Sequence, residues 1–266
     1  MKYKKNIILM GVITVILVII AIAMTLLMPM KETTQETPII SKGKVVFLPL
    51  PRIKGNMSVE EALAYRRSIR EYKKEPLTLF QLSQLLWAAQ GISETRWGFR
   101  TCPSAGATYP LEVYVVVGDN GVKGLQAGVY HYAPHSHTLT LVKEGDFRKE
   151  LYKAGLNQPW ILNAPVNLVI VAEYERTTRR YGERGIRYVH MEVGHAGQNV
   201  YLEATALGLG TVVIGAFYDD QVREVISASR NQHPLYIIPV GVPMKKYRIS
   251  ESQLWEYIQK NREKLE

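Results

Sequence analysis

The chain has 266 residues, of which 47% are hydrophobic and 21% charged, so it contains enough apolar material to bury a substantial core. This composition excludes a disordered protein, and the single cysteine, Cys102, excludes both a disulfide-stapled scaffold and a metal site built from cysteines. The net charge of +9 suggests an anionic ligand or an anionic surface without specifying either.

The N-terminus carries an apolar run that is long enough to cross a membrane. Ile7–Met28 contains no charged residue, and a helix of that length reaches about 33 Å. The run is longer than the apolar part of a signal peptide and ends without a small-x-small cleavage site, so we expect a retained anchor rather than a cleaved signal. Because Lys2, Lys4 and Lys5 precede it, we expect a cytoplasmic N-terminus and an extracytoplasmic catalytic domain.

The rest of the chain divides simply. Lys31–Pro38 is polar, with three threonines and a proline, and predicts a short tether. No linker or internal repeat interrupts the chain after this tether. We therefore expect a membrane anchor over residues 1–30, a tether over 31–44 and one globular domain over 45–266.

Two capping motifs predict the first helices of this domain. Ser58 opens a helix through Tyr65, and Thr78 opens another that ends at Gly91 and carries one apolar face, formed by Leu82, Leu85, Leu86 and Ala89. A longer amphipathic helix runs from Arg187 and stops at Gly208. Two further helices are expected, near Asp219–Ile226 and from Ser250.

Runs of β-branched and aromatic residues predict the strands. Buried strands are expected at Val113–Val117, Val166–Ala172, Thr211–Ile214 and Leu235–Val240, and a hairpin at Gly128–Tyr132 and Thr138–Val142. Helices and strands alternate irregularly and include a hairpin. The pattern favours an α+β sandwich, with a central, mostly antiparallel sheet and flanking helices, over a doubly wound parallel sheet.

Three short motifs could carry chemistry. Arg66-Arg67-Ser68-Ile69-Arg70 places three guanidinium groups and a hydroxyl within five residues, which suits a dianionic phosphate; the alternative is a solvated basic patch. Small residues and two prolines in Cys102–Pro110 would let a flat ligand approach the backbone, although an ordinary tight loop has the same composition. Gly208-Leu209-Gly210-Thr211 follows a helix and lacks a third glycine at Val213, so it is not a dinucleotide-binding fingerprint.

Other sites receive less support. His131, His135 and His137 have metal-like spacing, but we expect exposed turn histidines and no metal site. Cys102 would need an activating base to act as a nucleophile, and the sequence identifies none. The 16 tyrosines lie mostly within apolar strands and helices, so nucleic-acid binding is not expected.

Six segments taken in order resemble the nitroreductase-like flavoprotein family, and in particular its SagB-type branch, which includes peptide azoline oxidases. They are Arg66–Arg70, Pro103–Gly106 with Tyr109-Pro110, Gly128–Tyr132, Tyr181–Gly185, Glu192–His195 with Gln198-Asn199, and Gly208–Gly210 with Ile214-Gly215. The resemblance implies an FMN-binding α+β sandwich that forms an intertwined homodimer, with the flavin at the subunit interface. It implies a redox enzyme in which the cofactor performs the difficult chemistry.

The same resemblance assigns residues to the cofactor. The FMN phosphate would be held by Arg66, Arg67, Ser68 and Arg70, completed by Lys246 and Arg248. The isoalloxazine ring would lie along Ser104, Ala105, Gly106 and Ala107. A backbone N–H within Ile214, Gly215 and Ala216 would face flavin N5.

One departure from the family concerns Arg180-Tyr181. Azoline oxidases carry Lys-Tyr there, and an arginine cannot replace lysine as a general base. We therefore expect Tyr181 on the substrate side and Arg180 as an anion clamp, in a membrane-anchored oxidoreductase acting on a small or peptidic substrate. The alternatives are an azoline-type oxidase that forms thiazole or oxazole rings, and a non-catalytic flavin-binding module.

Overall fold

The computed structural model describes residues 40–42 and 44–265. Residues from Ile39 to Glu266 form one compact unit, which is described here. The predicted anchor, Ile7–Met28, lies outside the described residues. Within them, no helix is both long enough and apolar enough to span a bilayer.

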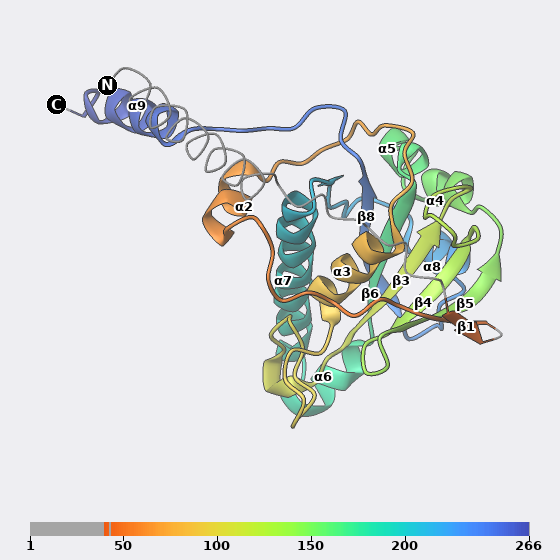
Figure 1. Ribbon diagram of the computed structural model, residues 1–266. Coiled ribbons are helices and arrows are strands. Elements are labelled where there is room, and N and C mark those ends of the chain that lie inside the picture. Colours follow the sequence, from red (N-terminus) through yellow and green to blue (C-terminus); the bar gives the residue numbers. More distant parts are fainter. Residues whose placement is uncertain (1–39, 43, 266) are drawn as a thin grey trace, which may run out of the picture. The chain divides into compact units, whose positions relative to one another are not determined.

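One eight-stranded sheet forms the centre of the domain, and every neighbouring pair of strands is antiparallel. The strand order is β1-β2-β5-β4-β3-β6-β8-β7 (Figure 1). The strands are β1 (Ile40–Lys42), β2 (Val45–Phe47), β3 (Leu111–Val117), β4 (Gly128–Ala133), β5 (Thr138–Glu144), β6 (Val166–Ala172), β7 (Gly210–Thr211) and β8 (His233–Gly241). The predicted hairpin is β4–β5, and the predicted α+β class is confirmed.

Both faces of the sheet are covered. Because side chains alternate along a strand, Val113 and Val115 of β3 join one apolar cluster, while Tyr114 and Val116 join another. The first cluster takes in α3 and α7, and the second takes in α4, α5 and α8. The helices are α2 (Val59–Tyr65), α3 (Leu79–Gln90), α4 (Arg148–Ala154), α5 (Pro159–Asn163), α6 (Tyr174–Tyr181), α7 (Arg184–Ala206), α8 (Asp219–Val225) and α9 (Glu251–Arg262), with a 3₁₀ turn, η1 (Ala105–Ala107).

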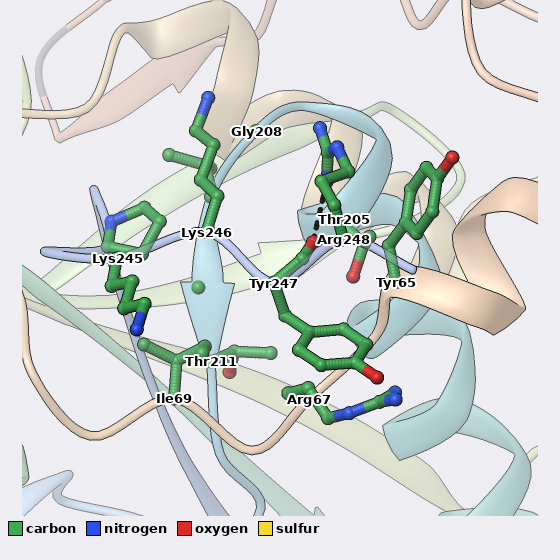
Figure 2. Close-up of a pocket in the computed structure, with 13 residues that line it drawn as sticks. Tyr65, Arg67, Ile69, Thr205, Gly208, Thr211, Lys245, Lys246, Tyr247 and Arg248 are labelled. Carbon is green, nitrogen blue, oxygen red and sulfur yellow. Dashed lines mark hydrogen bonds between the residues drawn. The ribbon is translucent and has the colours of Figure 1, made fainter. Parts of the chain in front are cut away.

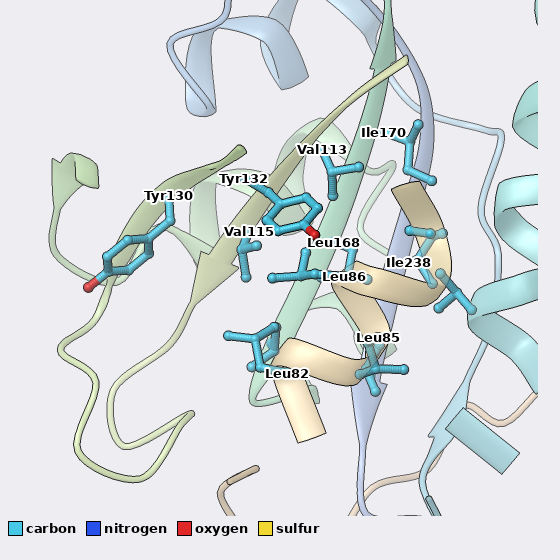
Figure 3. Packing of buried hydrophobic residues seen from close by; sticks show 14 of the residues in the cluster. Leu82, Leu85, Leu86, Val113, Val115, Tyr130, Tyr132, Leu168, Ile170 and Ile238 are labelled. Carbon is cyan, nitrogen blue, oxygen red and sulfur yellow. The ribbon is translucent and has the colours of Figure 1, made fainter. Parts of the chain in front are cut away.

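The capping motifs begin helices as predicted. The side chains of Ser58, Thr78 and Ser250 each accept a hydrogen bond from the backbone N–H three residues later. In each case the side chain at that later position accepts a hydrogen bond from the backbone N–H of the cap residue. Figure 3 shows the apolar face of α3 packed against β3, β6 and β8, with Leu82, Leu85 and Leu86 fully buried. These contacts fix α3, and with it the loop that leads to β3.

Several helices and strands begin or end at residues other than those predicted. The strand expected at Thr211–Ile214 is only the two-residue β7, because the chain turns away after Thr211 and Ile214 pairs with Ile237 through a single bridge. Helix α7 begins at Arg184 rather than Arg187. The short helices α4, α5 and α6 and the edge strands β1 and β2 were not predicted, since segments of this length carry little periodic signal.

Candidate functional site

Two segments far apart in the sequence meet in one small pocket at the C-terminal end of α7. The chain between α2 and α3 supplies Arg67, and the chain after β8 supplies Lys245, Lys246 and Arg248 (Figure 2). The described residues that line this pocket, which we call the cationic pocket, include no carboxylate. Since like charges held close together repel, the pocket favours a multiply charged anion.

Backbone hydrogen bonds hold the two segments together. The Ile69 N–H donates to the Thr211 oxygen at 2.8 Å, which adds the segment after α2 to the edge of the sheet. The Lys73 N–H donates to the Val242 oxygen at 2.8 Å, and the Met244 N–H donates to the Glu71 oxygen at 3.0 Å. The position of the cationic pocket is therefore set by sheet-like pairing rather than by loose loops.

Aromatic rings orient the guanidinium groups without neutralising them. The Arg67 Cζ lies 3.7 Å from the centroid of the Tyr247 ring, and the Arg248 Cζ lies 4.4 Å from that of Tyr65 (Figure 2). Gly208, at φ +72°, allows close approach, because a Cβ there would lie 3.0 Å from the Lys246 Nζ. The charges remain available to a ligand.

The rest of the predicted phosphate cluster is placed differently. Extended backbone directs successive side chains to opposite sides, so Arg66 and Ser68 face away from Arg67. The Ser68 Oγ lies 2.9 Å from the Tyr201 hydroxyl, which accepts a hydrogen bond from the Val213 N–H, and the Arg66 guanidinium lies over the Tyr201 ring. Arg70 is further away: it lies near the Trp160 ring, 5.2 Å from its centroid, and lines a separate groove.

The predicted flavin-facing backbone follows Val213 directly. Ile214 is buried and paired with Ile237, whereas Gly215 and Ala216 are exposed. Apart from its two chain neighbours, no described residue has an atom within 4 Å of the position that a Cβ would take at Gly215, so the backbone borders open space. A flat ring could approach it closely.

The loop predicted to lie along the ring forms a second cluster, next to α6. Gly106 adopts φ +60°, and the Arg180 Nη1 donates to its oxygen at 3.2 Å. A Cβ on Gly106 would lie 2.5 Å from the Tyr181 hydroxyl, so only glycine fits this position without displacing that side chain. The Ser104 Oγ accepts a hydrogen bond from the Tyr109 N–H at 2.9 Å and thereby closes the loop. Arg180 and Tyr181 are thus brought next to the Ser104–Ala107 loop.

Beneath this loop lies a carboxyl to which sequence reasoning assigned no role. Glu192 of α7 is only 3% exposed, and burial raises its pKa to about 7, against weaker opposing effects of the Ser104 hydrogen bond and the Arg100 charge. In the sequence, the burial of Glu192 was indicated only by its place directly before Val193, on the apolar face of a predicted helix. Cys102, alongside, is fully buried, and burial raises its pKa to about 12, so it is not an activated nucleophile.

The two clusters are separated along α7. The Cys102 Sγ, next to the loop, lies 3.4 Å from the Glu192 oxygen, whereas the cationic pocket is lined by Thr205. Thr205 follows Glu192 by thirteen positions on α7, which corresponds to about 20 Å along the helix. Within one chain the predicted phosphate-binding and ring-binding residues therefore form two separate groups.

The expectation of three exposed turn histidines is wrong for two of them. His137 is half-buried, lies 2.7 Å from the Ser83 Oγ and 2.9 Å from the Tyr132 hydroxyl, and has its pKa lowered by burial. His131 lies 2.8 Å from a Glu112 oxygen, and only His135 is exposed. No group of potential metal ligands gathers among the described residues.

Comparisons with known proteins agree on the family. The nitroreductase family matches residues 63–242. A nitroreductase of Methanocaldococcus jannaschii is 52% identical over 75% of this chain and 98% of its own length. The microcin B17-processing protein McbC of Escherichia coli is 30% identical, over 62% of each chain. The crystal structure of a nitroreductase from Ralstonia eutropha superposes with a TM-score of 0.66 at 30% identity, covering 79% of this chain and 95% of that one.

The matched region contains both clusters except for the basic segment after β8, which supplies Lys245, Lys246 and Arg248. The chain therefore belongs to the nitroreductase family and is an FMN-dependent oxidoreductase.

Proposed function

We propose that the cationic pocket holds the phosphate of FMN. The observation that carries this proposal is the convergence of Arg67, Lys245, Lys246 and Arg248 on one pocket that no described carboxylate lines. A phosphate dianion accepts several charge-assisted hydrogen bonds and relieves the repulsion among these groups. Arg66 and Ser68, next to Tyr201, would hold the adjoining part of the cofactor.

Bound FMN supplies the exchange of a hydride or an electron pair with the substrate. The chain's own residues hold and orient it. The exposed backbone at Gly215 and Ala216 would donate to the ring edge, and the Ser104–Ala107 loop would cover part of the ring. Tyr181 and Arg180 would then border the space that the substrate enters.

We further propose that the complete site forms between two copies of this chain. The separation of the two clusters along α7 supports this arrangement, because a second copy in the opposite orientation brings the loop of one chain to the pocket of the other. Exposed apolar side chains supply a surface for it, notably Ile186 and Met191 on α7. No residue of α9 is buried, and its large apolar residues are 41 to 70% exposed: Leu254, Trp255, Tyr257 and Ile258. We propose that α9 packs on the partner.

We favour a peptidic substrate over a small one, because the relative McbC is a microcin-processing protein. Azoline oxidation is the second candidate function. Arg180 distinguishes an azoline oxidase from another oxidoreductase that acts on a peptide. The Arg180 guanidinium donates to the Gly106 oxygen and carries a fixed positive charge. It can therefore bind an anionic or carbonyl group of the substrate, but it cannot accept a proton as a general base.

We also propose that Ile7–Met28 anchors the enzyme, with the domain on the extracytoplasmic side; protease protection of intact cells tests this orientation.

A comparison of FMN with riboflavin, which lacks the phosphate, tests the cofactor site. The full-length chain is purified in detergent and its affinity for each flavin is measured by fluorescence quenching. We expect a strong preference for FMN, which the Arg67→Ala/Lys246→Ala variant loses while its affinity for riboflavin stays unchanged. Lys153→Ala, which removes an exposed cation of α4, is the matched control and retains the preference.

Equal affinity of the unmodified chain for both flavins contradicts the assignment of the FMN phosphate to the cationic pocket.

An assay of Arg180→Lys on an azoline peptide tests the second candidate function, azoline oxidation. Azole formation that rises in this variant supports a ring-forming oxidase, and absence of the product from both proteins excludes it.

A further inference from the structure

Tyr201 lies on the face of α7 that reaches both the cationic pocket and the sheet. Thr205, one helical turn further on, lines the pocket, and its Oγ1 donates to the Tyr201 backbone oxygen at 2.8 Å. Gly197, one turn earlier, lets α7 approach the sheet closely, because a Cβ there would lie 3.5 Å from the Val213 Cγ2. Tyr201 is therefore placed between the pocket and the chain that follows β7.

The Tyr201 hydroxyl connects two segments that are far apart in the sequence. It accepts a hydrogen bond from the Val213 N–H at 2.9 Å, and its oxygen lies 2.9 Å from the Ser68 Oγ. Sheet pairing reaches Thr211 and resumes only at Ile214, so the Val213 N–H needs another acceptor, which the phenol supplies. One side chain thus contacts both the segment after α2 and the backbone that follows β7.

The chemistry of a phenol gives this connection a direction. A phenol oxygen shares its lone pairs with the ring, so it donates a hydrogen bond more readily than it accepts a second one. The Tyr201 oxygen already accepts from the Val213 N–H. The Arg66 guanidinium, 5.0 Å from the centroid of the Tyr201 ring, favours donation further by attracting the ring electrons. Tyr201 therefore donates its proton to the Ser68 Oγ, which leaves the Ser68 proton available to a ligand.

Ser68 is the exposed end of this chain of hydrogen bonds. Among the described residues, its hydroxyl contacts no hydrogen-bonding group other than Tyr201. In the proposed function, Ser68 holds the part of FMN that adjoins the phosphate. A serine whose proton is turned outward can donate to an oxygen of that part.

We propose that Tyr201 is a positioning residue for the cofactor, whose hydroxyl turns the Ser68 proton toward FMN and holds the backbone that leads to Gly215. The proposal rests on the proposed function, in which both segments contact FMN. It adds that the two contacts are joined through one side chain of α7. Loss of the Tyr201 hydroxyl should therefore affect both contacts, whereas loss of the Ser68 hydroxyl should affect only the first.

A double-mutant cycle tests the link to Ser68. The FMN affinity of the full-length chain in detergent is measured by fluorescence quenching. We expect Ser68→Ala to weaken binding about 5-fold in the unmodified chain, as for one hydrogen bond, but less than about 2-fold in Tyr201→Phe, where nothing turns the Ser68 proton outward. Equal losses in the two backgrounds, or an unchanged affinity in Tyr201→Phe, overturn the proposal.

Two further variants complete the cycle. Tyr152→Phe changes a partly buried tyrosine of α4, on the other face of the sheet, and should bind FMN like the unmodified chain. Ser68→Thr keeps a hydroxyl that Tyr201 can orient, so it should retain the affinity that Ser68→Ala loses. A loss in Ser68→Thr as large as that in Ser68→Ala overturns the proposal without any change at Tyr201.

The midpoint potential of bound FMN tests the link to the ring side. The backbone after Val213 is proposed to donate to the ring edge, so loosening it changes the balance between oxidised and reduced flavin. We expect the potential to shift in Tyr201→Phe and to stay unchanged in Ser68→Ala, which leaves the Val213 N–H bonded. No shift in Tyr201→Phe, or the same shift in Ser68→Ala, overturns the proposal.

Hydrogen exchange of the chain without cofactor separates this proposal from the proposed function. The Val213 amide should exchange faster in Tyr201→Phe than in Ser68→Ala, because only the first variant removes its acceptor. Equal exchange in the two variants overturns the role of Tyr201 and leaves the proposed function standing. A chain that takes up no FMN overturns the proposed function and, with it, the role of Tyr201 toward the cofactor.

Discussion

The surroundings of the C-terminal end of α7 and of its N-terminal half differ in how they accommodate charged side chains. At its C-terminal end, the cationic pocket gathers partly exposed cations, and none of the described residues that line it is a carboxylate, so its charge favours an anionic ligand. Toward its N-terminal half, Glu192 and Cys102 are buried, and burial pushes both toward the neutral form. The charges of the first region suit an anion, whereas burial in the second favours neutral side chains.

Charge reversal at each end tests this comparison most strongly. Lys246→Glu replaces a charge-assisted hydrogen bond with repulsion, so we expect FMN affinity to fall by about 3 kcal/mol, or roughly 100-fold. Arg180→Glu, at the other end, should leave the preference for FMN over riboflavin intact. Equal losses of that preference in the two variants, measured by fluorescence titration, would remove the distinction between the ends.

The pH dependence of the free energy of unfolding tests the burial of Glu192 alone. The pKa of Glu192 is raised from 4.5 to about 7 in the folded chain, so the folded chain keeps a proton that the unfolded chain releases. Its contribution to the free energy of unfolding therefore decreases as the pH rises through this window and stays lost above it. Glu192→Gln does not titrate, and relative to the unmodified chain it should gain about 2 to 3 kcal/mol between about pH 4 and about pH 8.

Urea denaturation of the full chain at the two pH values measures this gain. Glu256→Gln is the control, because Glu256 lies on the exposed helix α9. A gain that does not change with pH would mean that the pKa of Glu192 is the same in the folded and unfolded chain.

Gly106 sharpens the structural side of the comparison. It adopts the left-handed conformation, with φ +60° and ψ +22°, and a Cβ there would meet the Tyr181 hydroxyl and the Arg180 guanidinium. Gly106→Ala therefore adds a steric clash to the backbone strain of a left-handed alanine. We expect this variant to cost about 2 kcal/mol in urea denaturation, of which about 1 kcal/mol is recovered when Tyr181→Phe removes the hydroxyl. No recovery relative to Tyr181→Phe alone would mean that Tyr181 does not constrain the loop.

The smallest expected effect concerns the ring that orients Arg67. Tyr247→Leu keeps an apolar side chain but removes the cation–π contact with the guanidinium. We expect FMN affinity to fall only a few-fold, corresponding to about 0.5 to 1 kcal/mol. Tyr257→Leu, which changes an exposed tyrosine of α9, is the control. A loss as large as that of Lys246→Glu would show that Tyr247 contacts the cofactor itself.

The cationic pocket also shows how far the sequence could predict the site. The Arg66–Arg70 motif and the late Lys246 and Arg248 were both identified, and of that motif Arg67 lines one pocket with Lys246 and Arg248. Their division could not be predicted, because extended backbone turns Arg66 and Ser68 to one side and Arg67 to the other, and Arg70 ends near Trp160. Glu192 was visible only as an acid in an apolar helix face, and its raised pKa comes from burial by distant segments.

By itself the sequence determined the local features: the capped helices, the buried strands, the basic motifs and the small-residue loop. Each of these depends on a few neighbouring residues and on the period of the apolar side chains. The tertiary structure decided what depends on contacts between distant segments. It placed Lys246 near Arg67, separated the Ser104 loop from the pocket along α7, and buried Glu192 beneath Ser104. Burial and proximity are properties of the packed chain, because desolvation and Coulomb interactions act through space and not along the sequence.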